Sequence, residues 1–363
     1  MELLRYISGH SRIVYNSMKQ QKVTLKDLKF VLLIIFGIGF YHANAQIGGQ
    51  STYAFLNLEN SARIAALGGA SPVALDDDLS LAIANPSLIR PSMDQQLTFS
   101  FVDYFSDINY GFVSYSKDYD RLGSFVASVQ FIDYGTFKYA NEAGVQQGEF
   151  GASEFALILG WGRELTQNFR IGANSKFIYS NLEQYNSIGL AVDLSATYMA
   201  SRTDFVASVM ILNAGRQLKA YRSGNIEPLP FEIRFALSNK LKHIPFRYHL
   251  MLTHLEKFDL TYVNPLLQND FGQSVDEASL AEKMMSHVVV GGEILFSENF
   301  TFRFGYNYRR RQEMKVDSKF STVGFSWGFG IKVSKFQFNY ARSAYHLVGS
   351  PNYITMIVNL SDF

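Results

Sequence analysis

The sequence predicts an all-β fold, a transmembrane antiparallel β-barrel of about 14 strands with a short helical plug in its lumen. Three observations predict it. Segments of about ten to fourteen residues alternate apolar and polar side chains from position 95 to the end of the chain, long enough to cross an outer membrane when tilted. Short and long connections mostly alternate between these segments. No segment after position 45 reaches the ~18 apolar residues of a membrane helix.

The composition fits a chain with many side chains facing lipid. Aromatic residues make up 15% and charged residues 18% of the 363 positions, whereas an ordinary globular domain has about 25% charged residues. The 33 Lys and Arg residues nearly balance the 32 Asp and Glu residues, so no nucleic-acid partner is predicted. The chain has no cysteine, which excludes disulfides, thiolate metal sites and thiol nucleophiles.

Residues 1–45 are predicted to be a signal peptide. Four lysines between positions 19 and 29 precede the uncharged run 30–41, which is too short to span a bilayer as a helix. Ala43 and Ala45 then supply the small residues that signal peptidase selects, so we expect cleavage before Gln46. Met18 is an alternative start, because the residues ahead of it add nothing to such a signal.

Residues 46–94 are predicted to form the plug, and residues 95–363 the outer-membrane barrel. The plug segment is rich in small residues and is broken by Gly68-Gly69 and Asn85-Pro86, as expected of short helical turns. Its acidic run Asp76-Asp77-Asp78 has two interpretations. The run could bind a divalent cation, or it could cap a helix at 79–84 and meet lumen arginines. The spacing of a calcium loop is missing, which favours the second.

The strands follow the plug in an even number, as bacterial barrels require. Short turns belong to the periplasmic end of such barrels and long loops to the outside, so both chain ends are expected on the periplasmic side. The longest loops are expected at 135–151, 214–230 and 257–285. The strands are expected near residues 95–105, 107–117, 122–134, 152–164, 168–181, 186–200, 203–213, 231–241, 244–256, 286–297, 299–310, 318–332, 334–344 and 351–361.

Two strands show the alternation most clearly. In each, one face is bulky and apolar and the other small or polar, which predicts lipid outside and a filled lumen inside. The outward residues are expected to be Ile188, Leu190, Val192, Leu194 and Tyr198 in one strand and Val323, Phe325, Trp327, Phe329, Ile331 and Val333 in the other. The inward residues are expected to be Gly189, Ala191, Asp193, Ser195 and Thr197, and Thr322, Gly324, Ser326, Gly328, Gly330 and Lys332.

The sequence predicts no catalytic, cofactor-binding or metal-binding residue. Gly324 to Gly328 matches the G-x-S-x-G motif of hydrolases, but that chemistry needs a strained strand-to-helix turn, and here the motif lies in an alternating segment. Ser326 is therefore expected to fill the lumen. The seven histidines lack metal-ligand spacing. Arg309-Arg310-Arg311 is expected either to hold lipopolysaccharide phosphates or to lie in a solvated loop.

The long loops predict a protein-binding surface. Residues 275–285 have the pattern of a short amphipathic helix, which could dock a partner or fold over the barrel mouth. The loops 214–230 and 257–285 mix charges with large apolar side chains, as protein interfaces do. These candidate anchors are Leu218, Tyr221, Phe258, Leu266 and Phe271.

Several fragments together resemble a known family. With the signal peptide, the plug and the barrel, they are similar to the FadL-like outer-membrane barrel superfamily and, within it, to the PorQ-like proteins of the PorV/PorQ group in the Bacteroidetes type IX secretion system. The fragments are SARIAALGG at 61–69, Asn85-Pro86, QIGG at 46–49, Phe55-Leu56, DDDLSL at 76–81, YFSDINYG at 104–111, GWGR at 160–163, GRQLK at 215–219, PLPFE at 228–232 and HLEK at 254–257.

This resemblance implies a non-enzymatic outer-membrane barrel. Its implied partners are membrane lipid and lipopolysaccharide, a PorZ-like surface protein and other proteins of the complex that attaches secreted cargo to the cell surface. It assigns no individual residue to partner binding. The alternative is a FadL-type channel for hydrophobic small molecules, which should show an apolar pocket under the loops and a kinked or gapped strand. An anchor should instead show a sealed wall and an external patch. A lipase-like enzyme would need a nucleophile elbow and a partner histidine.

Overall fold

The structure is a computed structural model, and it describes residues 51–70, 72–140, 143, 145–261, 278–314, 321–345 and 349–363. The predicted signal peptide and its cleavage point therefore lie outside the described residues, as do the candidate anchors Leu266 and Phe271. Among the described residues, no helix is both long enough and apolar enough to cross a membrane.

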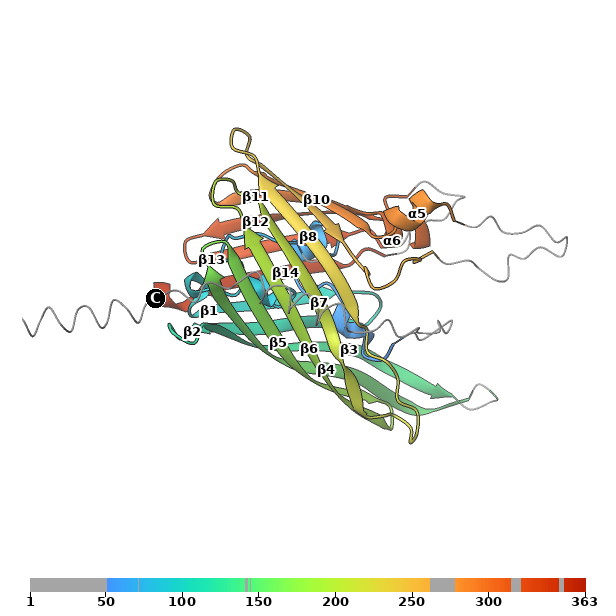
Figure 1. Ribbon diagram of the computed structural model, residues 1–363. Coiled ribbons are helices and arrows are strands. Elements are labelled where there is room, and N and C mark those ends of the chain that lie inside the picture. The colour runs from blue at the N-terminus through green and yellow to red at the C-terminus, as the bar shows by residue number, and fades with distance from the viewer. Residues whose placement is uncertain are drawn as a thin grey trace, which may run out of the picture. The chain divides into compact units, whose positions relative to one another are not determined.

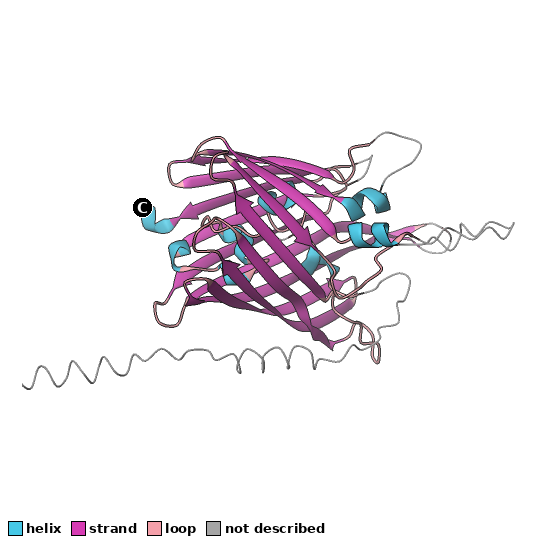
Figure 2. Cartoon of the chain, turned by 45° about the horizontal axis from the view of Figure 1, so that its top comes forward, coloured by secondary structure: helices cyan, strands magenta, loops and turns pink. Residues whose placement is uncertain are grey.

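Fourteen antiparallel strands form a closed barrel, as the sequence predicts (Figures 1 and 2). Each strand pairs with its neighbours in the chain, and β1 pairs with β14 from Gln96–Asn359 to Asp103–Asn352, which closes the ring. The strands are β1 (Gln96–Asp103), β2 (Asn109–Asp118), β3 (Ser124–Ala140), β4 (Gln146–Thr166), β5 (Phe169–Leu182), β6 (Tyr185–Met199), β7 (Val206–Lys219), β8 (Glu232–Lys240), β9 (Phe246–Leu252), β10 (Val288–Leu295), β11 (Phe300–Asn307), β12 (Phe325–Val333), β13 (Phe336–Ser343) and β14 (Asn352–Asn359).

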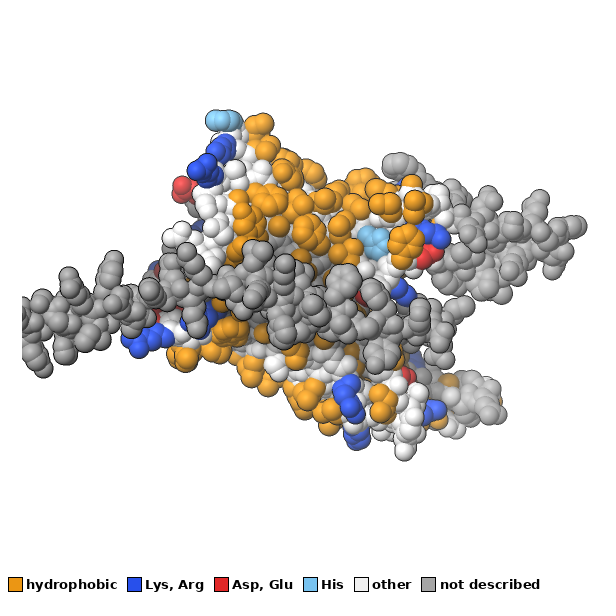
Figure 3. Space-filling view, in the orientation of Figure 1, with side chains coloured by type: hydrophobic (Ala, Val, Ile, Leu, Met, Phe, Trp, Pro, Cys, Tyr) orange, Lys and Arg blue, Asp and Glu red, His pale blue; other side chains and the backbone are white. Residues whose placement is uncertain are grey.

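The two faces of the barrel wall differ as predicted. Along β6, Leu190, Val192 and Leu194 are exposed, whereas Ala191 and Asp193 are buried in the lumen. Apolar side chains cover much of the outer surface between the charged groups at its ends (Figure 3). Because water would disfavour so large an apolar surface on a soluble protein, this face fits the hydrocarbon core of a bilayer.

The two ends of the barrel carry different connections. Short turns lie at the end that also holds the C-terminus, here called the turn end, and longer connections lie at the opposite loop end (Figure 1). One predicted long loop is wrong: most of 135–151 belongs to β3 and β4, which pair beyond a bulge between Asp133 and Thr136. The predicted loop 214–230 also starts late, because β7 continues to Lys219.

The strand predicted at 318–332 also begins later than expected. Gly324 has a φ of +89°, which turns the chain, and β12 starts at Phe325. Val323 therefore lies in the turn with 1% of its surface exposed and does not face outward. The other outward assignments in this strand are correct for Phe325, Trp327, Ile331 and Val333, which are exposed.

Short helices between Ala54 and Met93, ahead of β1, occupy the lumen, which confirms the predicted plug (Figure 2). Ser61 caps α3 by accepting a hydrogen bond from the Ile64 amide, and Asp78 caps α4 through the Ser80 amide, as short polar side chains do at helix starts. Proline opens η2 and η3. The elements are η1 (Ala54–Asn57), α3 (Ala62–Ala66), α4 (Leu79–Ala82), η2 (Pro86–Leu88) and η3 (Pro91–Met93).

Two helices stand at the loop end (Figure 1). The first, α5 (Leu280–Met285), falls within the helix predicted at 275–285, and Ser279 and Glu282 form a capping box at its start. The second, α6 (Tyr308–Met314), follows β11 directly and holds the three consecutive arginines. The chain ends in η5 (Leu360–Asp362) at the turn end.

Candidate functional site

Hydroxyl groups on the inner wall hold the first half of the plug. Thr355 on β14 accepts a hydrogen bond from the Ala62 amide at 2.9 Å. Ser326 on β12 donates to the Ala66 carbonyl at 3.0 Å, and Ser343 on β13 donates to the Ala65 carbonyl at 3.2 Å. These bonds satisfy backbone groups of a helix too short to satisfy its own. Ser326 is thus a plug contact, which agrees with its predicted place in the lumen.

The second half of the plug is held by the opposite wall. Arg170 on β5 donates to the carbonyls of Ser87 and Ile89 at 3.2 and 2.7 Å. A Cβ atom at Gly172 would lie 2.2 Å from the Pro86 carbonyl carbon, so only glycine allows the plug this close to β5. The Ser87 amide also donates to the Ser195 hydroxyl at 2.8 Å. The plug is therefore bonded to walls on both sides of the lumen.

A buried ionic cluster joins the plug to strands β9, β10 and β11. We call it the Glu293 cluster, and its members are Arg63, Asp76, Arg247, His249, Glu293 and Arg303. Glu293 is directly opposite Arg247 on β9 and Arg303 on β11. Arg247 reaches it at 2.9 Å and Arg303 at 2.8 Å. Arg63 enters from α3 and donates at 3.0 and 2.9 Å.

Asp76 adds a second carboxylate to this cluster from the plug side. It accepts hydrogen bonds from Arg63 at 2.8 and 2.7 Å and from Arg247 at 2.7 Å. Its place inside the barrel would by itself raise its pKa, although 32% of the side chain is open to solvent. The guanidinium groups of Arg63 and Arg247 outweigh this effect and hold the pKa of Asp76 below its usual value.

The acidic run of the plug therefore caps a helix and pairs with arginines, which is the interpretation that the sequence favoured. Asp78 caps α4, Asp76 meets lumen arginines, and Asp77 pairs with Arg90 at 2.6 Å. The described residues contain no group of three or more acidic or histidine side chains arranged to hold a metal ion. The partners of Asp76 could not be named from sequence, yet one signal was visible: Glu293 is a charge on the inward face of a strand whose other inward residues are apolar or glycine.

A second ionic cluster ties the plug to the loop end. It consists of Glu59, Arg310 and Tyr345, and we call it the Glu59 cluster. Arg310 on α6 pairs with Glu59 just before α3, and its guanidinium carbon lies 4.0 Å from the centre of the Tyr345 ring. The Tyr345 hydroxyl donates to Glu59 at 2.9 Å. Burial, and then the Glu59 carboxylate, raises the pKa of Tyr345 above its usual value.

This cluster corrects the expectation for the arginine run. Arg310 turns inward and is mostly buried, so it neither lies in solvent nor faces lipopolysaccharide. Arg311 donates to the Ser321 carbonyl at 2.5 Å, which fastens α6 to the start of the next segment. Arg309 lies 3.8 Å from Glu313 on the surface of the same helix. Sequence reasoning missed the role of Arg310 because its partner Glu59 is 251 positions away.

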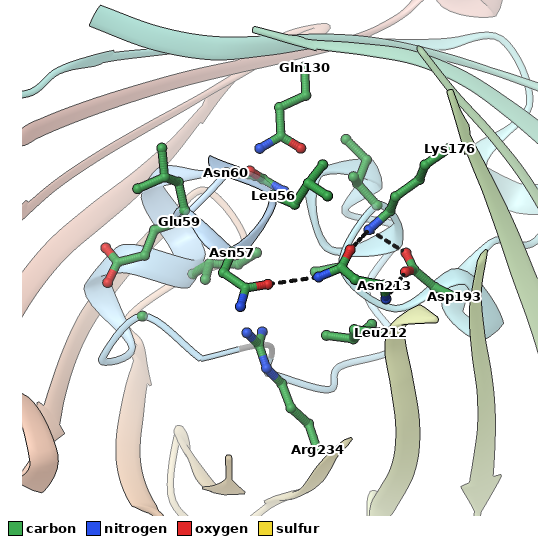
Figure 4. A pocket seen from close by; sticks show the side chains of 15 residues that line it. Leu56, Asn57, Glu59, Asn60, Gln130, Lys176, Asp193, Leu212, Asn213 and Arg234 are labelled. Carbon is green, nitrogen blue, oxygen red and sulfur yellow. Dashed lines mark hydrogen bonds and ion pairs between the residues drawn. The ribbon is translucent and has the colours of Figure 1, made fainter. Parts of the chain in front are cut away.

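A small cavity lies between the plug and strands β3 and β5 to β8 (Figure 4). Its volume is about 30 Å³, enough for one or two water molecules. Lys176 pairs with Asp193 at 2.8 Å, and Asn213 bonds to Asn57 across the cavity at 2.8 Å. Gln130 also lines this cavity, as do Leu56 and Leu212, so it is small and of mixed polarity, unlike the larger apolar pocket expected of a hydrophobic channel.

The loop end also carries exposed apolar side chains on the described part of the loop between β9 and β10. Phe258 is 68% and Met284 60% exposed, and Leu280 is similarly open. Lys283 on α5 pairs with Asp259 at 2.8 Å, which fixes the helix against the first part of the same loop. We call Leu255, Phe258, Leu280, Met284 and Met285 the loop-end patch.

The other candidate anchors behave differently from one another. Leu218 is exposed at the end of β7, as expected. Tyr221 is not a surface anchor, because its hydroxyl donates to Ser180 at 2.5 Å and its ring packs against Tyr53 of the plug. Burial raises the pKa of Tyr221 to about 12.

Comparison with known proteins identifies the fold. No family model and no curated protein matches the sequence. Among solved structures, the chain is similar to the Pseudomonas putida toluene transporter TodX, with 12% identity and a TM-score of 0.50 over 84% of this chain and 98% of that one. It is also similar to a Pseudomonas aeruginosa FadL homologue, with 8% identity and a TM-score of 0.47 over 83% and 98%. The protein therefore shares the barrel fold of the toluene transporter TodX.

Proposed function

We propose that this protein is an outer-membrane barrel, sealed by its plug, that works at its loop end by holding a partner protein on the cell surface. This is the role implied by the resemblance to the PorQ-like proteins of type IX secretion, in which the partner is a PorZ-like surface protein. The observation that carries the proposal is the filled lumen. Hydroxyls, Arg170 and the Glu293 cluster bond the plug to the wall from both sides, and the Glu59 cluster bonds it to α6.

The closed wall supports the same proposal. Every strand pairs with two neighbours, and the apolar outer surface fits hydrocarbon. A barrel of this kind leaves the membrane-spanning part inert and places the variable chemistry on its connections. Both chain ends would then face the periplasm and the loop-end patch would face the outside.

The loop-end patch offers a surface suited to a protein partner. Exposed apolar side chains that gather beside charges mark interaction sites more often than isolated ones do. The capping box of α5 and the pair between Lys283 and Asp259 hold Phe258 and Met284 in place before any partner arrives. Preformed surfaces bind more tightly, because less conformational entropy is lost on binding.

A hydrophobic channel is the second candidate, and one observation favours it. The wall is irregular in β3, where Gly135 has a φ of +78° and the register with β4 shifts between Asp133 and Thr136. A kinked strand is what the channel hypothesis expects. The fold shared with the toluene transporter TodX is compatible with both candidates, because fold alone does not determine function.

The test compares a double variant in the loop-end patch with a single variant on another loop. Phe258→Asp with Met284→Asp places charges in the loop-end patch, and Ile226→Asp places one on a different loop at a residue that is 64% exposed. We expect the first variant to lose the surface partner and the display of secreted cargo, and the second to keep both, at equal amounts of folded barrel. Unchanged partner retention in the first variant would overturn the proposal. Loss of hydrophobic-solute uptake in cells lacking the protein, with partner retention unaffected, would support the channel instead.

A further inference from the structure

A recess opens into the lumen at the turn end, on the other side of the plug from the loop-end patch. Its volume is about 470 Å³, within the size range of small-ligand sites. Inward-facing residues of strands β8 to β13 line it, together with two plug residues. The charged groups that matter are Lys240, Arg247, Arg303 and Lys332 from the wall and Arg63 and Asp76 from the plug.

Several charged donor groups of the recess have no acceptor in the part of the chain that the structure describes. Among the described residues, Lys240 and Lys332 have no ion-pair partner, and Arg247 donates through only one of its three nitrogens. Arg303 donates through Nε and one terminal nitrogen, which leaves the other free. Of the nearby carboxylates, Asp76 is already engaged by two arginines. Glu298 is an exposed turn residue.

A buried donor without a partner lies next to the recess, on the inner face of β13. Asn339 is 2% exposed, and its carbonyl oxygen accepts from Arg303 at 2.8 Å. Its amide nitrogen has no partner among the described residues, although buried polar groups are almost always paired. Gly330 lines the recess here. A Cβ atom on it would lie 2.5 Å from the Asn339 oxygen and 2.7 Å from Arg303, so the glycine leaves room for both head groups at the wall.

We propose that this recess binds a small oxyanion, a carboxylate or phosphate group on a molecule that reaches the turn end of the barrel. Planar guanidinium groups match the geometry of such anions, and lysines at the rim add charge and donors without fixed geometry. Lys240 on β8 and Lys332 on β12 are the exposed cations of the lining, and the less exposed Arg247 and Arg303 supply its guanidinium groups. The inference concerns the end away from the loop-end patch and does not depend on the proposed partner.

The test uses the full-length barrel in detergent micelles and isothermal titration calorimetry, with pyrophosphate and succinate as probes. The recess variant is Lys240→Gln with Lys332→Gln. The matched control is Lys242→Gln with Lys335→Gln, which removes two lysines from the same two turns outside the recess. We expect the recess variant to bind at least about tenfold more weakly than the wild type, since charge-assisted bonds are the strong ones, and the control to bind like the wild type. The better probe identifies the phosphate or the carboxylate as the preferred group.

Three results would overturn the proposal. These are no binding of either probe by the wild type at millimolar concentration, equal weakening in the recess variant and the control, and an affinity that does not fall with added salt. Attraction between solvent-accessible charges is screened by salt, so the last measurement needs no variant and remains decisive if a substituted barrel folds poorly.

Discussion

The Glu293 cluster and the Glu59 cluster both fasten the plug, but they are built on different supports. Glu293, Arg247 and Arg303 belong to three neighbouring strands, and the register of the ladder places them side by side. Arg310 instead belongs to α6, a short helix in a loop. Strand pairing fixes the wall members of the first cluster, whereas the second depends on a short helix outside the ladder. We therefore expect the plug to be held more rigidly near the turn end than at the loop end.

The largest expected effect comes from breaking the Glu293 cluster. Glu293→Ala removes the carboxylate shared by three buried arginines, so Arg303 loses its ion-pair partner and Arg63 and Arg247 keep only their pairs with plug carboxylates. Removing one partner of a buried ion pair costs about 3–5 kcal/mol, so the temperature at which the folded band is lost on heat-modifiability gels should fall strongly. Glu298→Ala, five residues further on and exposed, is the control and should be nearly neutral. Similar melting of both variants would refute the rigid hold of this cluster on the plug.

A smaller effect is expected at the loop end. Arg310→Ala removes the partner of the buried Glu59, but α6 can shift to let water reach that carboxylate. We therefore expect the free energy of unfolding to fall by about 2 kcal/mol, which is more than for an exposed ion pair and less than for a rigid buried one. The variant should also be cut faster near α6 in limited proteolysis while the barrel stays intact. Arg309→Ala, on the exposed side of the same helix, is the control. An effect as large as that of Glu293→Ala would erase the distinction between the two clusters.

The pH dependence sharpens the comparison further. The pKa of Asp76 is lowered in the folded state, so its contribution to stability is complete above its unfolded pKa of about 3.9 and is lost as the pH falls through the lower folded value. Asp76→Asn should therefore destabilise the barrel by about 1–2 kcal/mol near neutral pH. The gap to the wild type should close as the pH falls below about 4. Thermal unfolding of both proteins across this range measures the gap, and a gap that stays constant would contradict the ionic role of Asp76.

The strands could be predicted because the same two-residue repeat of apolar and polar side chains runs through them. Outward apolar residues such as Leu190 and inward small ones such as Ala191 follow from the two-residue repeat of a strand between lipid and a filled lumen. The repeat fails where both faces meet water, which is why most of 135–151 was expected to be a loop although it extends β3 and β4. It also fails at Gly324, where a left-handed turn delays β12.

For the two clusters, the sequence indicated the type of interaction but not the partner residues. Asp76 and its neighbours indicated lumen arginines, but the partner Arg247 is 171 positions away and meets it only after fourteen strands close in register. The same holds for Glu59 and Arg310. Local patterns specify which face a side chain takes, whereas the identity of its partner depends on contacts distant in sequence. The turn-end recess was invisible for this reason, since its four wall cations come from four strands and a fifth, Arg63, comes from the plug.

The smallest expected effect concerns Ser326, an uncharged residue of β12 that contacts α3. Ser326→Ala removes the hydrogen bond to the Ala66 carbonyl and leaves that group with less support, which should cost about 1 kcal/mol. Because the serine is buried against the plug, we expect partner retention and cargo display to stay at wild-type levels. Ser343→Ala, which removes the neighbouring bond to Ala65, should behave in the same way and serves as its match. A loss of function in the Ser326 variant, with the Ser343 variant normal and both barrels equally folded, would instead reopen the hydrolase interpretation of the Gly324 to Gly328 motif.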